Sequence, residues 1–374
     1  MTDLDRAVAR MFCIGFDGYT IPPHVEKLID RGISGVALFR RNVESPRQFA
    51  RLCADLKHRA GRPFIVCVDQ EGGRVLRLRD SAFTDIPSMR DLGKANEENL
   101  AVQIGRVLAR ELRAVNGDLN FAPVLDVDTN PKNPVIGDRS LGGSPEMVAR
   151  LGVALIRGIQ GEGVAACGKH FPGHGDTWQD SHFDLPRLPH GMGRLGAIEL
   201  APFRAAVRAG VATIMTAHVV YEGIDPKFPA TLSKEILTGV LREQLGFGGV
   251  IISDDMEMNA ISEHFGWEES IVQATAAGVD LFMVCHDAQR QESALDVLRD
   301  AVTRGLVDRE RIDQANLRVV KMFTQYVKPP AEEDPMGVIG NAEHRAVAER
   351  IRKLAGSPSP APAHDPTEPG SGQA

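Results

Sequence analysis

The chain of 374 residues lacks the features that mark membrane proteins and nucleic-acid-binding proteins. It has no apolar stretch that approaches the ~20 residues of a membrane span. Its basic residues form no run or stripe, and the net charge of −7 is spread along the chain. Nucleic acids and anionic membranes are bound by clustered Lys and Arg, so we expect neither among the partners of this protein.

Signs of secretion are also missing. The first residues, Met1–Arg6, are polar and acidic, without the basic start, apolar core and small-residue cleavage site of a secretory signal. The five cysteines are odd in number, form no Cys-x-x-Cys pair and mostly lie in apolar runs. Such cysteines are typical of buried free thiols in a reducing compartment, so we expect a cytoplasmic protein.

The chain does contain eight apolar runs of strand length, separated mostly by segments with helical spacing. Apolar rather than alternating strands favour a parallel sheet that is covered on both faces. Eight of them fit a single-domain (β/α)8 barrel of the TIM type, whereas the alternative, a doubly wound open sheet, usually has fewer strands. The runs are Met11–Phe16, Gly35–Phe39, Pro63–Val68, Leu119–Val127, Val164–Gly168, Ala212–Ala217, Gly249–Ser253 and Val279–Val284.

We place the barrel at residues 1–330 and a helical extension at residues 331–355. Ser45-Pro46 and Ser144-Pro145 are typical helix starts, with Ser as the N-cap and Pro in the first turn. The tail at residues 356–374 is rich in Pro, Ser and Gly, cannot form a core and is expected to be disordered. The predicted helices include Glu97–Val115, Pro145–Gln160, Leu195–Arg208, Lys234–Leu245, Gln289–Arg304, Ile312–Val327 and Ala342–Leu354.

Polar side chains gather where the predicted strands end. In a (β/α)8 barrel the carboxyl ends of the strands carry the active site, and scattered structural residues would not favour one end. The clustering therefore predicts an enzyme. The residues are Asp69, Asp126, Asp128, Lys169, His170, His218, Asp254, Asp255, Cys285 and His286.

The segment from Lys169 to His182 combines an ammonium group, three imidazoles and two carboxylates on a turn-rich loop. These groups suit proton transfer to a polar substrate, and Asp180 beside His182 would fix the tautomer of that histidine and raise its pKa. A metal site is the alternative, although the spacing matches no helical His-Glu-x-x-His pattern. The ligands would then be His170, His174, Asp176 and His182.

Three further positions have a functional and a structural interpretation each. Asp254 follows a buried strand, as a nucleophile would, but it or Asp255 could cap a helix. Asp69 and Arg77 flank a Gly-Gly turn and could bind sugar hydroxyls or form local ion pairs. Arg139 could reach into the site or hold its own loop together. His218 and Met256 are additional candidates to line the site.

Five stretches of the sequence resemble the family 3 glycoside hydrolases, and within them the single-domain β-N-acetylglucosaminidases of the NagZ type. The resemblance covers about residues 5–330, and KHFPGHG followed by DSH is its most specific block. The stretches are VDQEGGRVLRL (68–78), FAPVLDVDTNPKNPVIGDRSLG (121–142), KHFPGHGDTWQDSHFDLP (169–186), MTAHV (215–219) and GVIISDDMEM (249–258).

The resemblance implies a role for each matching residue. Asp254 would be the nucleophile that forms a covalent glycosyl-enzyme, and His182, in a dyad with Asp180, the general acid and later the general base. The residues that would bind N-acetylglucosamine in the −1 subsite are Asp69, Arg77, Arg139, Lys169 and His170.

From the resemblance we expect a cytoplasmic, retaining exo-β-N-acetylglucosaminidase that takes muropeptides as its saccharide substrate during cell-wall recycling. We expect it to need no cofactor and no metal, and to act as a monomer rather than an oligomer. Three alternatives stay open at this point: a β-N-acetylglucosaminide phosphorylase, a metal-dependent hydrolase, and a muropeptide-binding sensor without catalytic activity.

Overall fold

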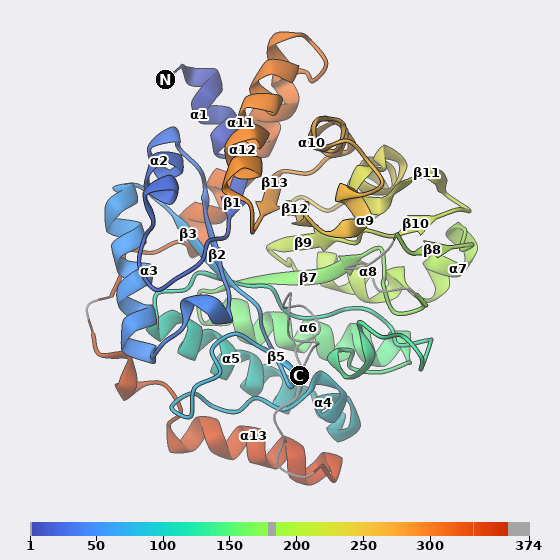
Figure 1. Cartoon of the computed structure of the whole chain (residues 1–374). Helices are drawn as coiled ribbons and strands as arrows, with labels where there is room; N and C mark the ends of the chain where they lie inside the picture. Colours follow the sequence, from blue (N-terminus) through green and yellow to red (C-terminus); the bar gives the residue numbers. More distant parts are fainter. Residues whose placement is uncertain (1, 179–184, 332, 358–374) are drawn as a thin grey trace.

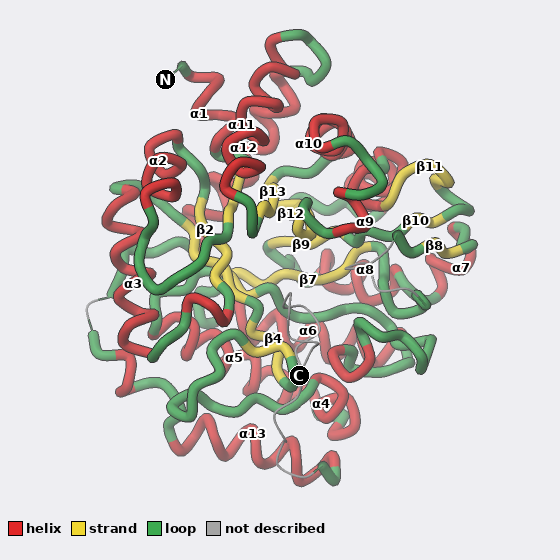
Figure 2. Tube along the Cα trace, viewed as in Figure 1, coloured by secondary structure: helices red, strands yellow, loops and turns green. Residues whose placement is uncertain are grey.

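The computed structural model describes residues 2–178, 185–331 and 333–357. Eight parallel strands close into a barrel in the order β1-β13-β12-β9-β7-β6-β3-β2, which confirms the predicted fold. The strands gather at the centre of the molecule and the helices surround them (Figures 1 and 2). The strands are β1 Phe12–Ile14, β2 Gly35–Leu38, β3 Ile65–Val68, β6 Leu119–Asn120, β7 Ala165–Phe171, β9 Thr213–Thr216, β12 Val250–Asp255 and β13 Leu281–Val284.

Each strand lies within or overlaps one of the eight predicted runs, and the ends of β6 and β7 differ most from the predicted ones. β6 has only two residues, but the chain beyond it stays hydrogen-bonded to β7, through an isolated bridge between Val124 and Lys169 and through the N–H of Cys167, which donates to the carbonyl of Ala122 at 2.8 Å. β7 continues three residues past the predicted end at Gly168, so Lys169 and His170 lie inside the strand and not after it. Their polar partners at the barrel mouth, described below, allow these residues to continue the strand.

The helices around the barrel mostly match the predicted ones. The predicted helix Leu195–Arg208 is instead two helices, α7 Met192–Ala197 and α8 Leu200–Arg208. Pro202 explains the interruption, because proline lacks a backbone N–H and fits only the first turn of a helix. The other helices are α1 Asp3–Ala9, α2 Pro23–Arg31, α3 Pro46–Ala60, α4 Met89–Ala95, α5 Glu98–Ala114, α6 Pro145–Gly161, α9 Asn259–Ser262, α10 Trp267–Ala277, α11 Ala288–Thr303, α12 Arg309–Tyr326 and α13 Ala342–Ala355, together with the π-helix η4 Glu235–Gln244.

The predicted caps and thiols are present. The hydroxyl of Ser45 accepts a hydrogen bond from the backbone N–H of Gln48, and Ser144 accepts one from Met147 in the same way. All five cysteines are buried free thiols. No helix in the described part of the chain is long and apolar enough to span a bilayer.

Alternate residues of the strands belong to two different cores. Phe12 and Val66 pack outward under the helices, whereas Cys13 and Cys67 point into the barrel. The inner core also contains the Val319 side chain and three other side chains of α12. This alternation is the two-residue period of an extended strand.

α12 crosses the amino-terminal mouth of the barrel. Arg311 in its first turn donates to Asp280 at 2.7 Å, directly before β13. Lys328, just beyond its last residue, donates its backbone N–H to Asp118, directly before β6. Because β13 and β6 lie on opposite sides of the closed barrel, α12 covers that mouth, and the carboxyl-terminal mouth is the one through which a substrate can enter.

Two small sheets, which the sequence did not predict, lie at the carboxyl-terminal end of the barrel. One is the hairpin of β4 Gln70–Gly72 and β5 Val75–Leu76, which follows β3. Gly72 and Gly73 make its turn with positive φ angles of 122° and 58°, a conformation that glycine adopts without strain. The other sheet consists of β8 Arg187–Leu188, β10 Val220–Tyr221 and β11 Asp225–Pro229.

Candidate active site

The carboxyl-terminal mouth brings together residues that are far apart in the sequence. Lys169 of β7 donates to Asp69 Oδ1 at 2.7 Å and lies 2.6 Å from Glu71 Oε1 on the β4 hairpin. Arg77 Nη2 lies 3.2 Å from the second oxygen of Asp69. The structure therefore places three of the predicted binding residues in direct contact.

The charges in this group stabilise one another. Burial alone would raise the pKa of the Asp69 carboxyl, but Lys169 and Arg77 outweigh it and lower that pKa. Burial likewise opposes the charge of Lys169, and the two carboxylates nevertheless raise its pKa. Asp69, with 16% of its side chain exposed, is thus an ionised acceptor that is held in place and reachable from the mouth.

Arg139 both holds its own loop in place and reaches the barrel mouth, the two roles that the sequence left open. Its guanidinium makes a bidentate ion pair with Glu71, at 2.9 Å from Nε to Oε2 and 2.8 Å from Nη2 to Oε1, and both side chains are buried. Its Nη2 also lies 3.4 Å from His170 Nε2. Arg139 therefore ties its loop to the β4 hairpin and at the same time reaches the mouth.

Glu71 is a site residue that we did not predict, although the sequence carries a signal for it. In an extended segment, residues two apart point to the same side, so Glu71 lies on the side of Asp69. Two cations contact it, and although burial would raise its pKa, Arg139 and Lys169 lower the pKa far below the ordinary range.

Asp126, one of the polar residues predicted near the strand ends but given no role there, orients His170. Its carboxylate lies 2.7 Å from His170 Nδ1 and accepts the backbone N–H groups of His170 and His174, at 3.1 and 2.6 Å. Burial by itself would raise the pKa of Asp126, but His170 and these hydrogen bonds outweigh burial and lower that pKa. Since an ionised carboxylate only accepts, His170 donates through Nδ1, and its Nε2 faces Arg139.

Asp254 and Asp255, at the end of β12, have different partners. Asp255 accepts hydrogen bonds from the backbone of Glu257 and Cys285, at 3.2 and 3.3 Å, and lies 3.2 Å from His286 Nε2. It therefore holds the turn after β12 to the end of β13. Asp254 Oδ1 accepts the N–H of Asp255 at 2.9 Å, and its partly exposed side chain lies in the mouth.

His218 and Met256 are both buried. His218 Nδ1 lies 2.7 Å from the Thr231 hydroxyl, and its Nε2 donates to the carbonyl oxygen of Asp255 at 3.0 Å. Burial lowers the pKa of His218, so the neutral ring positions the backbone next to Asp254. Met256 packs in the outer core of the barrel.

His182 and Asp180 lie outside the described residues, but the segment that leads to them is described. His174 Nδ1 lies 2.9 Å from the Thr177 hydroxyl, and burial lowers the pKa of His174 to about 4. Asp176 contacts His190 Nε2 at 2.7 Å and accepts from Thr129 at 2.7 Å. Within residues 2–178, 185–331 and 333–357, no group of three or more His, Cys, Asp or Glu side chains is placed to hold a metal ion.

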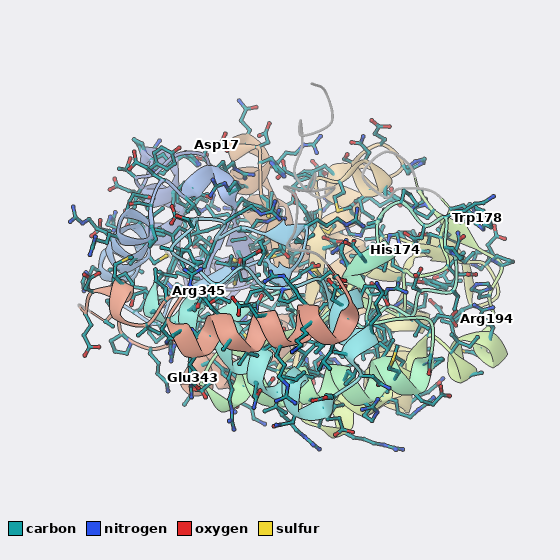
Figure 3. The ribbon with its side chains drawn as sticks, turned by 90° about the horizontal axis from the view of Figure 1, so that it is seen from below. Asp17, His174, Trp178, Arg194, Glu343 and Arg345 are labelled. Atoms are coloured by element: carbon teal, nitrogen blue, oxygen red, sulfur yellow. The ribbon has the colours of Figure 1, made fainter. Side chains whose placement is uncertain are left out.

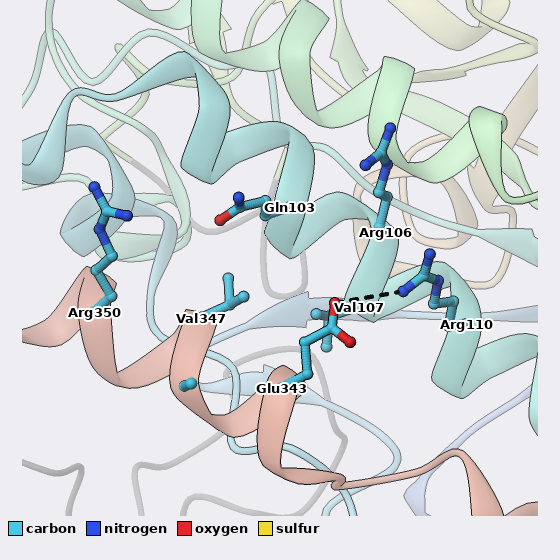
Figure 4. A pocket seen from close by; sticks show the side chains of 8 residues that line it. Gln103, Arg106, Val107, Arg110, Glu343, Val347 and Arg350 are labelled. Atoms are coloured by element: carbon cyan, nitrogen blue, oxygen red, sulfur yellow. Dashed lines mark ion pairs between the residues drawn. The ribbon is translucent and has the colours of Figure 1, made fainter.

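A separate groove lies on the helical layer between α5 and α13 (Figure 4). Arg110 in this groove is 3.9 Å from Glu343 and 3.1 Å from Glu162. Arg350 is 3.0 Å from Glu97. These surface ion pairs are local contacts between helices, and the groove carries none of the residues at the barrel mouth.

Comparison with known proteins agrees with this geometry. The model of the glycosyl hydrolase family 3 N-terminal domain matches residues 9–322. The β-hexosaminidase of Thiobacillus denitrificans is 42% identical over 275 residues, which cover 72% of this chain and 76% of that protein. The β-hexosaminidase of Neisseria meningitidis serogroup C is 44% identical over 268 residues, covering 70% and 73%.

Solved structures share the fold. A family 3 β-N-acetylglucosaminidase from Paenibacillus has a TM-score of 0.89 and 41% identity, covering 95% of this chain and 69% of that one. NagZ from Neisseria gonorrhoeae in complex with N-trifluoroacetyl-D-glucosamine has a TM-score of 0.77 and 35% identity, covering 92% and 98%. Fold, barrel mouth and relatives agree, and the chain belongs to glycosyl hydrolase family 3.

Proposed function

We propose that this family 3 enzyme is a retaining exo-β-N-acetylglucosaminidase. In this proposal it works in the cytoplasm and removes the non-reducing terminal N-acetylglucosamine from β-1,4-linked muropeptides that end in 1,6-anhydro-N-acetylmuramic acid, with or without peptide. The names of the related β-hexosaminidases, and the N-acylglucosamine in the related NagZ structure, support the sugar at the −1 position.

The observation that carries the proposal is the linked set of charges at the carboxyl-terminal mouth. Asp69, Lys169 and Arg139 are each fixed by an oppositely charged partner, at distances of 2.7 to 2.9 Å. Such fixed donors and acceptors suit a molecule that presents several hydroxyl groups, because charge-assisted hydrogen bonds are strong and directional. His170 adds a ring whose tautomer Asp126 sets.

Asp254 is the proposed nucleophile beside this set. Its carboxylate would attack the anomeric carbon while the bond to the leaving-group oxygen breaks, and His182 would protonate that oxygen. The same histidine, oriented by Asp180, would then take a proton from water, which cleaves the glycosyl ester and releases the sugar with its β configuration retained.

The test is release of p-nitrophenol from its β-N-acetylglucosaminide by the purified protein with EDTA present. We expect robust release that falls by about 10⁴-fold or more in Asp254→Asn, because an amide is a poor nucleophile. Folded protein without activity would overturn the proposal. Activity that depends on added zinc would favour a metal-dependent hydrolase instead.

The same reaction separates hydrolysis from phosphorolysis. In phosphate buffer we expect free N-acetylglucosamine, seen first as its β anomer by NMR. N-acetylglucosamine 1-phosphate as the main product would overturn hydrolysis in favour of phosphorolysis.

A further inference from the structure

Trp178 is an unusually exposed aromatic side chain. It is 67% exposed, and among the described residues only Tyr19, at 47%, is another exposed aromatic. Figure 3 shows Trp178 near the edge of the molecule and His174, from the same segment, further inside. An exposed indole presents a large apolar face that the face of a sugar ring can cover.

The backbone next to Trp178 is firmly anchored. Thr177 is fully buried; its carbonyl oxygen accepts from Asn130 at 2.9 Å, and its hydroxyl accepts from Asn133 at 3.1 Å. The side-chain oxygen of Asn133 in turn accepts the backbone N–H groups of Val135 and Ile136. The exposed ring therefore projects from a fixed point.

Thr177, which anchors Trp178, connects to the candidate active site through direct contacts. Thr177 contacts His174 at 2.9 Å, and the His174 ring lies edge-on to His170 with 5.9 Å between ring centres. The Asp254 carboxylate opposes the lowering of the His174 pKa by burial, which places the two side chains near each other. Trp178 thus lies on the rim, a few contacts outward from the residues proposed to bind the −1 sugar.

Lys132 adds a positive charge to this rim. Its ammonium nitrogen lies 5.9 Å from the centre of the Trp178 ring, and its side chain is exposed. Lys132 comes from the loop that also carries Arg139, between the two asparagines that anchor Thr177. The two loops therefore present an aromatic face and a cation together.

We propose that Trp178 and Lys132 form an aglycone platform, which binds the leaving-group saccharide when that saccharide carries a carboxylate. This inference rests on the proposed glycosidase function. Lys169 and Arg139 are buried in their ion pairs at the inner side of the mouth, so the rest of a bound substrate extends outward over the rim. There the indole packs against the apolar face of a sugar ring, and the ammonium group attracts the carboxylate.

Binding can be tested without catalysis in the Asp254→Asn variant. We expect N-acetylglucosaminyl-β-1,4-N-acetylmuramic acid to change the tryptophan fluorescence on binding, and N-acetylglucosamine alone to bind without that change. The change should disappear in Asp254→Asn with Trp178→Phe, which keeps Trp267 as the only tryptophan. A disaccharide that binds by calorimetry but leaves the Trp178 fluorescence unaltered would overturn the platform.

Kinetics separate the two members of the platform. We expect Trp178→Ala to lower kcat/KM for the acidic disaccharide about tenfold, mainly through KM. Lys132→Met should lower it about threefold for the acidic disaccharide but not for neutral N,N′-diacetylchitobiose, and high salt should remove the difference.

The matched control is Leu317→Ala, which truncates a similarly exposed side chain (72%) on α12, at the other mouth. It should leave kcat/KM for both disaccharides unchanged. If Trp178→Ala and Lys132→Met behave like this control, the platform is wrong while the glycosidase function stands. If the parent protein hydrolyses neither disaccharide, the proposed function fails, and the fluorescence experiment still decides whether the platform binds.

Discussion

The two mouths of the barrel use the same chemistry for different purposes. At the amino-terminal mouth, Asp280 contacts Arg242, Arg311 and Arg318 and also accepts the N–H of Ile251 at 3.0 Å. Two of these arginines, Arg311 and Arg318, belong to α12, so the contacts of Asp280 hold this helix across the mouth. At the carboxyl-terminal mouth, no helix among the described residues crosses a similar set of carboxylates and cations.

The difference shows that burial of ion pairs does not by itself mark a site. Asp280 has no exposed surface, and its oxygens are used by the protein itself. Asp69 is also paired, yet it retains an exposed fraction of 16% on its side chain, which leaves it available to a ligand. In barrels of this kind the amino-terminal face serves stability and the carboxyl-terminal face serves catalysis.

The largest expected effect comes from a substitution at the amino-terminal mouth. Asp280→Asn leaves three arginines without their shared carboxylate, and we expect the free energy of unfolding to fall by about 3–5 kcal/mol. The molecules that stay folded should keep their kcat/KM, because the site is at the other mouth. Denaturant unfolding and activity below the transition measure both quantities; a folded but inactive variant would contradict the separation of roles.

Asp69→Asn should have the opposite pattern at the carboxyl-terminal mouth. We expect kcat/KM for p-nitrophenyl β-N-acetylglucosaminide to fall by about 10²- to 10³-fold, because a charge-assisted contact to the sugar is lost in the transition state. Unfolding should change much less than in Asp280→Asn. Nearly full activity with a large loss of stability would make Asp69 a structural residue.

The pH dependence of stability sharpens the comparison further. Burial lowers the pKa of His174 from 6.5 to about 4, so between these pH values the unfolded chain binds a proton that the folded protein does not. Stability therefore rises with pH over this window and is lost as the pH falls, by about 3 kcal/mol for this group. His174→Asn should flatten that part of the stability profile; identical slopes would exclude the contribution of His174.

The smallest expected effect concerns α13, which lies at neither mouth. His344 Nδ1 contacts buried Glu111 at 2.8 Å, and Arg345 donates to the carbonyl of Ser81 at 3.0 Å, in the segment that follows Arg77. His344→Ala should lower stability by about 1–3 kcal/mol. Hydrogen exchange should be faster in α13 and in residues 80–86 but unchanged in β7. Uniform acceleration would mean that α13 is not a separate anchor.

Much of the fold could be predicted because it depends on local patterns. Buried parallel strands read as apolar runs, and polar residues placed after them point to the carboxyl-terminal mouth. Asp69 and Lys169 could be placed in the site on this basis. The resemblance to a known family supplied the roles of His182 and Asp180, which stay predictions.

The rest depended on contacts between distant residues. Glu71 and Arg139 are separated by 68 positions, and Asp126 and His170 by 44, so neither pair can be read from spacing. The position of α12 across the amino-terminal mouth likewise depends on Asp118 and Asp280, which only the closed barrel brings within reach of one helix.

The most direct measurement is mass spectrometry of the His182→Ala variant mixed with p-nitrophenyl β-N-acetylglucosaminide. Without its general base, the glycosyl-enzyme should form from this good leaving group and then hydrolyse slowly, so it accumulates. We expect one N-acetylglucosaminyl group per protein, located by peptide mapping on Asp254. No adduct during turnover, or an adduct on another residue, would contradict Asp254 as the nucleophile of this site.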